Sequence, residues 1–115
     1  KNIWLDFLQK ASKILAEKTY SDLAKGKFRF DFFLVDYDTL IEIDGEQHFK
    51  PKYGRQNFIK GQEHDRRKNS YCLAHGIKLY RIPYWDVYKI KTLQDTFKDH
   101  YLVKTRWHSD NLTPP

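Results

Sequence analysis

The chain has 115 residues, enough for one folded domain and too few for two independent cores. Lys and Arg number 21 against 15 Asp and Glu, and the net charge of +6 favours a polyanionic partner. The single cysteine, Cys72, excludes an intrachain disulfide scaffold and argues against a cysteine-based zinc site. No apolar run approaches the roughly 18 residues of a membrane span, so we expect a soluble, cytoplasmic chain.

The sequence starts at Lys1 and contains no Met, so we expect it to be a fragment of a longer protein. Aromatic residues make up 17% of the chain, and their large buried areas can supply the core of a small domain. One domain is predicted over residues 1–103, followed by an irregular tail at 104–115.

The first 44 residues predict a helix and then a β-hairpin. Apolar residues within 3–18 recur at spacings of three and four, which is typical of an amphipathic helix. The aromatic-rich stretch 28–35 predicts a strand, residues 36–39 predict a turn, and 40–44 predict a second strand. The two strands are expected to pair as an antiparallel hairpin.

The second half of the chain predicts a loop, two helices and a strand. Proline and glycine interrupt the polar, basic residues 46–60, which indicates a loop. Residues 62–75 predict a charged helix with Gly76 as its C-terminal cap, and residues 77–82 alternate as a strand. Asp86 is a candidate N-cap for a last helix that reaches residue 101. The order helix, strand, strand, helix, strand, helix predicts a small α/β domain.

Three acidic side chains are predicted to share one face of the hairpin. Alternation along the second strand puts Glu42 and Asp44 on the same side. With a four-residue turn, Val35 would pair with Leu40, Phe33 with Glu42, and Asp31 with Asp44. Directly opposed aspartates repel each other unless a cation lies between them, and their hard oxygen ligands suit Mg²⁺. The alternative is that these acids are solvated and have no role.

Two further groups follow the acidic strand. His48 comes soon enough after Asp44 to reach the same pocket, where it could take a proton from water. The alternative is an ordinary surface histidine. His64 and Asp65 open the charged helix, and the basic residues that follow are either phosphate contacts or solvated side chains.

Two stretches of the sequence carry a resemblance to a known family. FRFDFFLVDYDTLIEIDGEQHF at 28–49 and HDRRKNSYCLAHGIKLYRIPYWD at 64–86 resemble the PD-(D/E)XK endonuclease superfamily. The particular likeness, over residues 28–88, is to phage homing endonucleases related to very-short-patch-repair nucleases. It implies a small restriction-endonuclease-like catalytic domain in which helices flank a mixed β-sheet.

The resemblance also implies an activity. It points to a Mg²⁺-dependent endonuclease, with Mn²⁺ as a substitute, that hydrolyses double-stranded DNA in a bacterial or phage-infected host. A homodimer, and a specificity domain on flanking sequence, are further expectations. Two alternatives stay open, a mismatch-directed repair nicking enzyme and a non-catalytic DNA-binding module.

The resemblance assigns roles residue by residue. Asp31, Asp44 and the main-chain carbonyl of Ile43 are the implied metal ligands, although Asp44 stands where the superfamily usually carries lysine. His48 matches a histidine of the repair-type relatives and is expected to act as general base or to orient the nucleophile, with Asp65 or Glu42 polarising it. The catalytic candidates are Asp31, Glu42, Asp44, His48, His64, Asp65 and Glu17, the last on the predicted first helix. The candidates for binding DNA are Lys50, Lys52, Arg55, Lys60, Arg66, Arg67 and Lys68.

Overall fold

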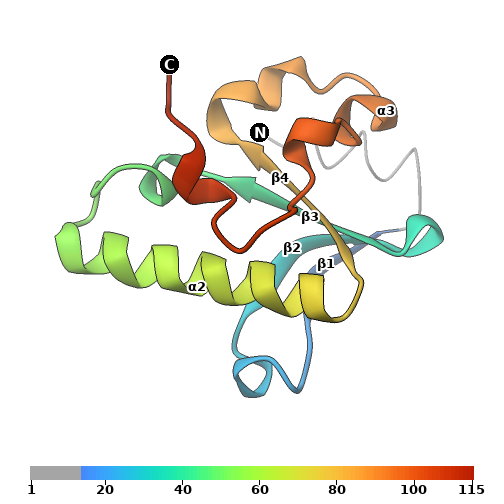
Figure 1. Ribbon diagram of the computed structural model, residues 1–115. Coiled ribbons are helices and arrows are strands. Elements are labelled where there is room, and N and C mark those ends of the chain that lie inside the picture. Colours follow the sequence, from blue (N-terminus) through green and yellow to red (C-terminus); the bar gives the residue numbers. More distant parts are fainter. Residues whose placement is uncertain (1–13) are drawn as a thin grey trace.

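The computed structural model describes residues 14–115 and contains a four-stranded mixed sheet in the order β1-β2-β3-β4 (Figure 1). The strands are β1 Ile14–Thr19, β2 Arg29–Leu34, β3 Thr39–Asp44 and β4 Lys78–Pro83. Neighbours pair antiparallel except β3 and β4, which are parallel. Parallel neighbours need a crossover connection, and α2, Arg55–Ala74, provides it. The chain therefore has the α/β class that the sequence predicts.

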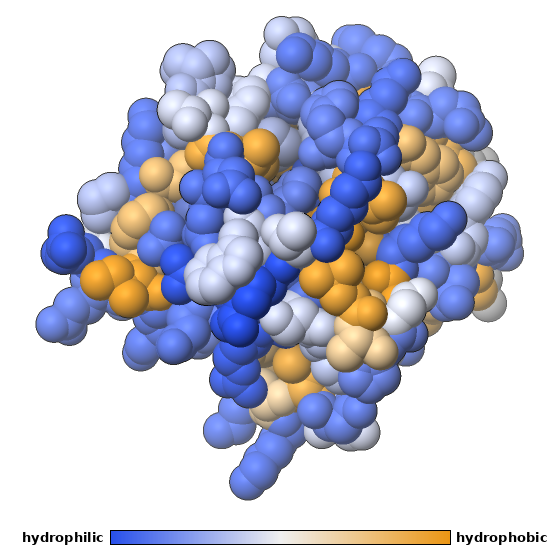
Figure 2. Space-filling view, in the orientation of Figure 1, coloured by the Kyte–Doolittle hydropathy of each residue, from blue (hydrophilic) through white to orange (hydrophobic). Residues whose placement is uncertain are grey.

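The sheet is covered on both faces (Figure 1). Beneath α2 lies an apolar cluster that includes Phe30, Leu40 and Leu79. The opposite face is covered by η4 Tyr84–Lys89, the short helix α3 Leu93–Thr96 and η5 Asp99–Tyr101. A second apolar cluster fills that side, built from Leu34, Ile41, Tyr80, Ile82, Ile90, Leu93 and Tyr101. The exterior seen in Figure 2 is mostly hydrophilic, with apolar patches interrupted by polar side chains.

The predicted hairpin forms, but its register is shifted by two residues. Phe33 pairs with Leu40 and Leu34 with Thr39, so Val35 does not pair with Leu40 as predicted. The reason lies in the turn, because η2 takes up Val35–Tyr37 and Asp38 closes it in the left-handed region at φ 50°. A shift of two keeps the predicted alternation of Glu42 and Asp44, but it brings Asp31 next to Glu42 instead of Asp44.

The predicted first helix is wrong over residues 14–18. These residues form part of β1, which pairs with β2 along its length. Apolar residues three and four apart also occur in strands, and pairing with β2 overrides the local helical pattern here. The rest of the prediction, residues 3–13, lies outside the described residues.

The predicted charged helix is longer than expected. It begins at Arg55 rather than Gln62, so the second half of the predicted loop is helical. Gly54, at φ 100°, ends the loop, whereas Gly61 lies inside the helix and does not break it. The C-terminal end agrees with the prediction, because Gly76 follows the helix at φ 66°.

The predicted last helix does not form as one element. Residues 84–101 contain the turns η4 and η5 with only α3 between them, and Pro83 takes the N-cap position of η4. Asp86 is not an N-cap, because its carboxylate accepts a hydrogen bond from Tyr101 Oη at 2.9 Å and pairs with Lys89 Nζ at 3.0 Å. The Asp86 side chain therefore connects the beginning of the segment 84–101 to its end.

The tail packs on α2. It contains η6, Ser109–Asn111, and Asp110 accepts a hydrogen bond from Arg66 Nε at 2.9 Å. The buried Asn69 donates to the main-chain carbonyl of Arg106 at 3.1 Å. Residues 104–115 thus contain a short 3-10 helix and contact α2. Within residues 14–115, none of the helices has the length and apolar character to cross a membrane.

Candidate active site

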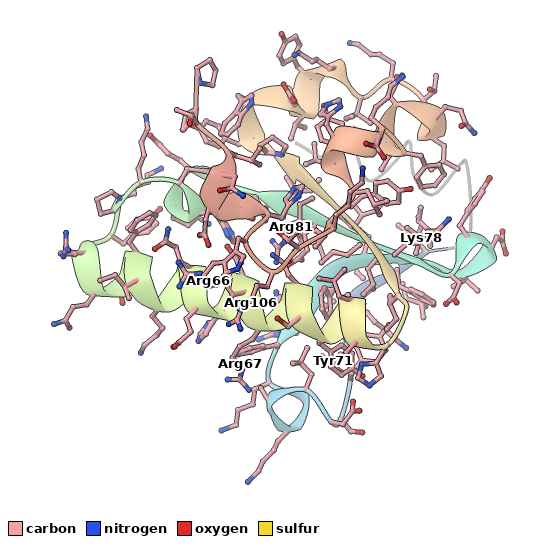
Figure 3. The ribbon with its side chains drawn as sticks, viewed as in Figure 1. Arg66, Arg67, Tyr71, Lys78, Arg81 and Arg106 are labelled. Carbon is pink, nitrogen blue, oxygen red and sulfur yellow. The ribbon has the colours of Figure 1, made fainter. Side chains whose placement is uncertain are left out.

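A cluster of charged and polar side chains is buried between the sheet and α2. Glu42 and Asp44 extend from β3, Arg81 from β4, and Asp65 and Asn69 from α2, and all five are at most 4% exposed. They continue the row that begins with Leu40 and Leu79, so the interior changes from apolar to ionic along these two strands. Figure 3 shows Arg81 inside the molecule, between the sheet and α2.

Arg81 is the cation at the centre of this cluster. Its Nη1 donates to both oxygens of Asp44, at 2.8 and 3.1 Å, and its Nε donates to Asn69 Oδ1 at 2.8 Å. Its Nη2 lies 3.6 Å from an oxygen of Asp65. Burial alone would lower the pKa of the guanidinium, but the surrounding carboxylates raise it, so Arg81 stays charged.

His48 connects the buried cluster to the surface. Its Nδ1 lies 2.8 Å from Asp65 Oδ2 and 3.8 Å from Asp44 Oδ1. Burial lowers the pKa of His48, but the hydrogen bond to Asp65 and the two negative charges outweigh this, so the net shift is upward. The pKa of Asp65 is lowered, because Arg81 and His48 outweigh the effect of its burial. A carboxylate that holds one nitrogen of an imidazole leaves the other free to exchange a proton.

Asp31 and Glu42 join β2 to β3 where the regular ladder stops. The backbone pairs end at Phe32 and Ile41. Beyond that point Glu42 Oε1 accepts the main-chain N–H of Asp31 at 2.8 Å, and Asp31 Oδ2 accepts the N–H of Ile43 at 2.7 Å. Carboxylate oxygens therefore take the place of carbonyls, which fixes both side chains in position.

Asp31 carries a negative charge that its surroundings compensate poorly. Burial and the neighbouring Glu42 raise its pKa to about 6 against a usual value near 3.8, and the N–H of Ile43 and Lys68 offset only part of this. Glu42 has a partner, since Lys68 Nζ lies 2.8 Å from its Oε2. A carboxylate held in place with a raised pKa is a group that a bound cation would stabilise.

A cavity of about 380 Å³ opens beside His48. It lies between residues 47–53 and the first half of α2. Its lining residues are Gln47, His48, Lys50, Lys52, Tyr53, Asn57, Phe58 and Gly61. His48, which is hydrogen-bonded to Asp65, thus lines the same cavity as two lysine side chains.

Several predicted site residues lie elsewhere. The His64 ring packs 4.6 Å from the Phe28 ring and makes no contact with the cluster. Glu17 is exposed on β1 and pairs with Arg29 at 3.0 Å. The carboxylate–histidine group therefore contains Asp31, Glu42, Asp44, His48 and Asp65 from the predicted catalytic set.

The predicted DNA-binding residues fall into two groups. Lys50, Lys52, Arg55, Lys60 and Arg67 are exposed. Lys68 instead neutralises Glu42 and also contacts the carbonyl of Arg29. Arg66 pairs with Asp110, and its guanidinium lies 4.8 Å from the Trp107 ring, with Arg106 on the same ring at 5.0 Å (Figure 3). Lys68 and Arg66 therefore have partners within the protein. So do two of the exposed residues, because Lys50 and Lys52 lie 3.6 and 3.4 Å from the carboxylate of Glu46.

Sequence reasoning missed Arg81 and Asn69. The strand pattern IKLYRI contained a signal, because alternation places Arg81 on the same side as the buried Leu79. An arginine on a buried strand face requires acidic partners, and those partners are the acids of β3. No signal in the sequence of α2 marks Asn69 as different from its polar neighbours.

The metal prediction fits these residues in part. Asp44 has both oxygens bound by Arg81, so the argument that a metal relieves repulsion between Asp31 and Asp44 is wrong. Within residues 14–115, no group of three or more His, Cys, Asp or Glu side chains is arranged to hold a metal ion. Asp31 still suits Mg²⁺, which is commonly held by one or two carboxylates with waters and a substrate phosphate.

The charges of the cluster also suit a divalent cation. Four carboxylates, of Asp31, Glu42, Asp44 and Asp65, face two permanent cations among the described residues, Arg81 and Lys68. With His48 neutral, two negative charges remain, and with His48 protonated, which its raised pKa favours, one remains. In either state a bound cation would reduce the excess of negative charge.

Comparison of the chain with protein-family models, curated proteins and solved structures gives no match.

Proposed function

We propose that the chain is a metal-dependent DNA endonuclease that hydrolyses phosphodiester bonds, as the catalytic domain of a homing endonuclease. The observation that carries the proposal is the contact of His48 with Asp65 at 2.8 Å, beside a cavity lined by Lys50 and Lys52. The net charge of +6 and the exposed basic residues favour a polyanionic substrate. The sequence resemblance names that substrate as double-stranded DNA.

In this mechanism His48 acts as the general base. Asp65 accepts the hydrogen bond from Nδ1 and fixes the ring, which leaves Nε2 to take a proton from the attacking water. The water oxygen forms a bond to phosphorus as the bond to one ester oxygen breaks, and the departing oxygen takes a proton from a solvent water, giving a phosphate monoester and a hydroxyl. Arg81 and Asn69 do not touch the substrate; they hold Asp44 and the nearby carboxylates in place.

Asp31 and the main-chain carbonyl of Ile43 would hold Mg²⁺. When bound there, the ion would stabilise the negative charge that develops on the phosphate and acidify a water molecule. The main-chain N–H of Ile43 donates a hydrogen bond to Asp31, which keeps the Asp31 carboxylate next to Ile43. Glu42 accepts a hydrogen bond from the main-chain N–H of Asp31 and pairs with Lys68. It therefore positions Asp31 and is not needed as a metal ligand.

The test is nicking of a supercoiled plasmid in the presence of Mg²⁺. The His48→Ala protein should lose activity by about 10²–10⁴-fold, the range for loss of a general acid or base. The Asp31→Asn protein should lose activity because it lacks the carboxylate that would hold Mg²⁺. His75→Ala is the control, since His75 is exposed at the end of α2, and it should cleave at the wild-type rate. Unchanged cleavage by both site variants would reject the catalytic assignment.

A non-catalytic DNA-binding module is the second candidate. It is favoured by the engagement of Asp44 with Arg81 and by the absence, within residues 14–115, of a three-residue metal-ligand group. Such a module should bind DNA equally well in EDTA and in Mg²⁺ and should leave the plasmid intact. Comparing mismatched with intact duplexes as substrates separates a repair nicking enzyme from a homing enzyme.

A further inference from the structure

The cavity beside His48 has walls of three chemical kinds. Lys50 and Lys52 bring positive charge, Tyr53 and Phe58 bring aromatic rings, and Gln47 and Asn57 bring side-chain amides. Both lysines lie near one carboxylate, that of Glu46, at 3.6 and 3.4 Å, so the pair keeps one positive charge in excess. Cations bind phosphate, rings stack on a base, and amides hydrogen-bond to a base edge. These three kinds of group correspond to the parts of a nucleotide.

The two amides have hydrogen-bonding capacity to spare. Asn57 Nδ2 donates to the carbonyl of Tyr53 at 2.9 Å, which orients the amide and leaves its oxygen unpaired within residues 14–115. Gln47 makes no hydrogen bond to a described residue, and its side chain folds over Gly45, where a Cβ atom would come within 2.7 Å of it. Gly45 therefore makes room for the Gln47 amide at the cavity.

Gly61 keeps the cavity open on the helix side. Glycine inside a helix is less stable than alanine, and Gly61 lies in the seventh position of α2. A Cβ atom there would meet nothing within 4 Å, so the missing side chain is not explained by crowding. Gly61 lines the cavity, so a larger residue at this position is expected to project into it.

The size of the cavity limits what can enter. At about 380 Å³ it lies in the lower part of the range for small-ligand sites, roughly 300–1,000 Å³. A stacked base pair cannot enter a space bounded by a loop and a helix, whereas one nucleotide that has left the stack can. His48 on the cavity wall would then lie next to that nucleotide's phosphate.

We infer that this cavity binds a single unstacked nucleotide of the DNA substrate, with the phosphate toward Lys50 and Lys52 and the base between Tyr53, Phe58 and the amides of Gln47 and Asn57. The inference rests on the proposed function and names the form of DNA that the site takes. Taking a base out of the duplex requires energy, least at mismatches and in single strands. Single-stranded and mismatched DNA should therefore bind more tightly than a regular duplex.

The test uses 2′-deoxyadenosine 5′-monophosphate, titrated in EDTA and followed by amide chemical shifts. Saturable shifts are expected at Tyr53, Asn57 and Phe58, whereas inorganic phosphate alone should shift only signals near the lysines. Gly61→Leu fills the cavity and should weaken nucleotide binding by about tenfold to a hundredfold. Gly61→Ala adds a single methyl group in open space, so it should raise the melting temperature and bind as the wild type does.

A parallel experiment measures the binding of a single-stranded oligonucleotide and of the same sequence as a duplex, by fluorescence anisotropy in EDTA. The single strand should bind more tightly, and Gly61→Leu should remove that preference while duplex binding persists. The inference would be overturned if the wild type and Gly61→Leu bound the nucleotide with equal affinity. It would also be overturned if the nucleotide and inorganic phosphate caused identical chemical-shift changes. Because no cleavage is measured, an inactive protein that binds the nucleotide would refute only the proposed nuclease function. An active nuclease that does not bind it would refute only the cavity assignment.

Discussion

Arg81 Nη1 donates to both carboxylate oxygens of Asp44, at 2.8 and 3.1 Å, and neither side chain is more than 2% exposed. Arg81→Leu leaves this carboxylate buried without a cation and should lower the free energy of unfolding by about 3–5 kcal/mol. Urea denaturation followed by circular dichroism measures the loss.

The control for this change is Arg29→Ala, which removes an exposed ion pair with Glu17 and should change stability by less than about 1 kcal/mol. A double variant, Arg81→Leu with Asp44→Leu, should recover much of the loss, since no unpaired charge remains. A single Arg81→Leu protein as stable as the wild type would contradict the central role of Arg81.

Replacing Asp31 by Asn should stabilise the metal-free protein at pH 8. The pKa of Asp31 is about 6 in the folded protein and near 3.8 when exposed, so the folded state favours the protonated form. The ionised carboxylate thus reduces stability as the pH rises from about 4 to 6, and the reduction persists above that. Below pH 4 the variant and the wild type should be equally stable, because the carboxyl is protonated in both states.

Melting temperatures across this pH range, with and without Mg²⁺, measure both effects of Asp31. Mg²⁺ should raise the melting temperature of the wild type at pH 8, and Asp31→Asn should not respond to it. Asp99→Asn, at an exposed pair with Lys104, is the control and should respond as the wild type does. An equal response to Mg²⁺ in wild type and Asp31→Asn would place any metal elsewhere.

The activity should rise with pH as His48 loses its proton. The pKa of His48 is above the usual 6.5, because the bond to Asp65 and two nearby charges outweigh burial. Only the neutral ring accepts a proton, so cleavage should increase through that raised pKa. Asp65→Asn removes one negative charge and should therefore lower the pKa of His48, which NMR measures. The pH range over which cleavage increases should move to lower pH with it. A titration unaffected by Asp65→Asn would show that the two residues do not interact.

Lys60 and Lys68 should behave differently when changed to alanine. Lys60 is exposed, so Lys60→Ala should leave stability unchanged. If Lys60 contacts one phosphate, its loss should reduce the slope of log affinity for DNA against log salt concentration by about 0.9. Lys68 neutralises the buried Glu42, so Lys68→Ala should lower stability by about 1–3 kcal/mol. Salt titrations of binding and urea denaturation together test the pair, and a stability loss confined to Lys60→Ala would refute this division.

The hairpin and its acidic face follow from local pattern. Alternation assigned Glu42 and Asp44 to one side whatever the register, because a shift of two residues preserves the face. The register itself depended on the turn, in which Asp38 adopts the left-handed conformation. Asp36 and Asp38 are both good turn residues, so the sequence did not indicate which of them would adopt it. Opposite partners were therefore assigned incorrectly while the chemistry of the face was correct.

Other features depended on contacts distant in sequence. The cation for Asp44 comes from a strand 37 residues later, and only the parallel pairing of β3 with β4 brings Arg81 beside it. Asp86 had the residue type of a helix cap, but a distant Tyr101 hydroxyl uses its carboxylate. A pattern within one segment gives no information about such partners, which is why the metal was invoked for a charge that an arginine already balances.

The main-chain N–H groups of Asp31 and Ile43 donate to carboxylates instead of carbonyls, and this makes the spacing of β2 and β3 sensitive to charge. Neutralising either acid would change the strength of its hydrogen bond to the neighbouring strand without changing the regular ladder beside it. The exchange rates of these two amide protons with solvent deuterium would then report the ionisation of the site directly, from the backbone, in a protein whose substrate had not been added.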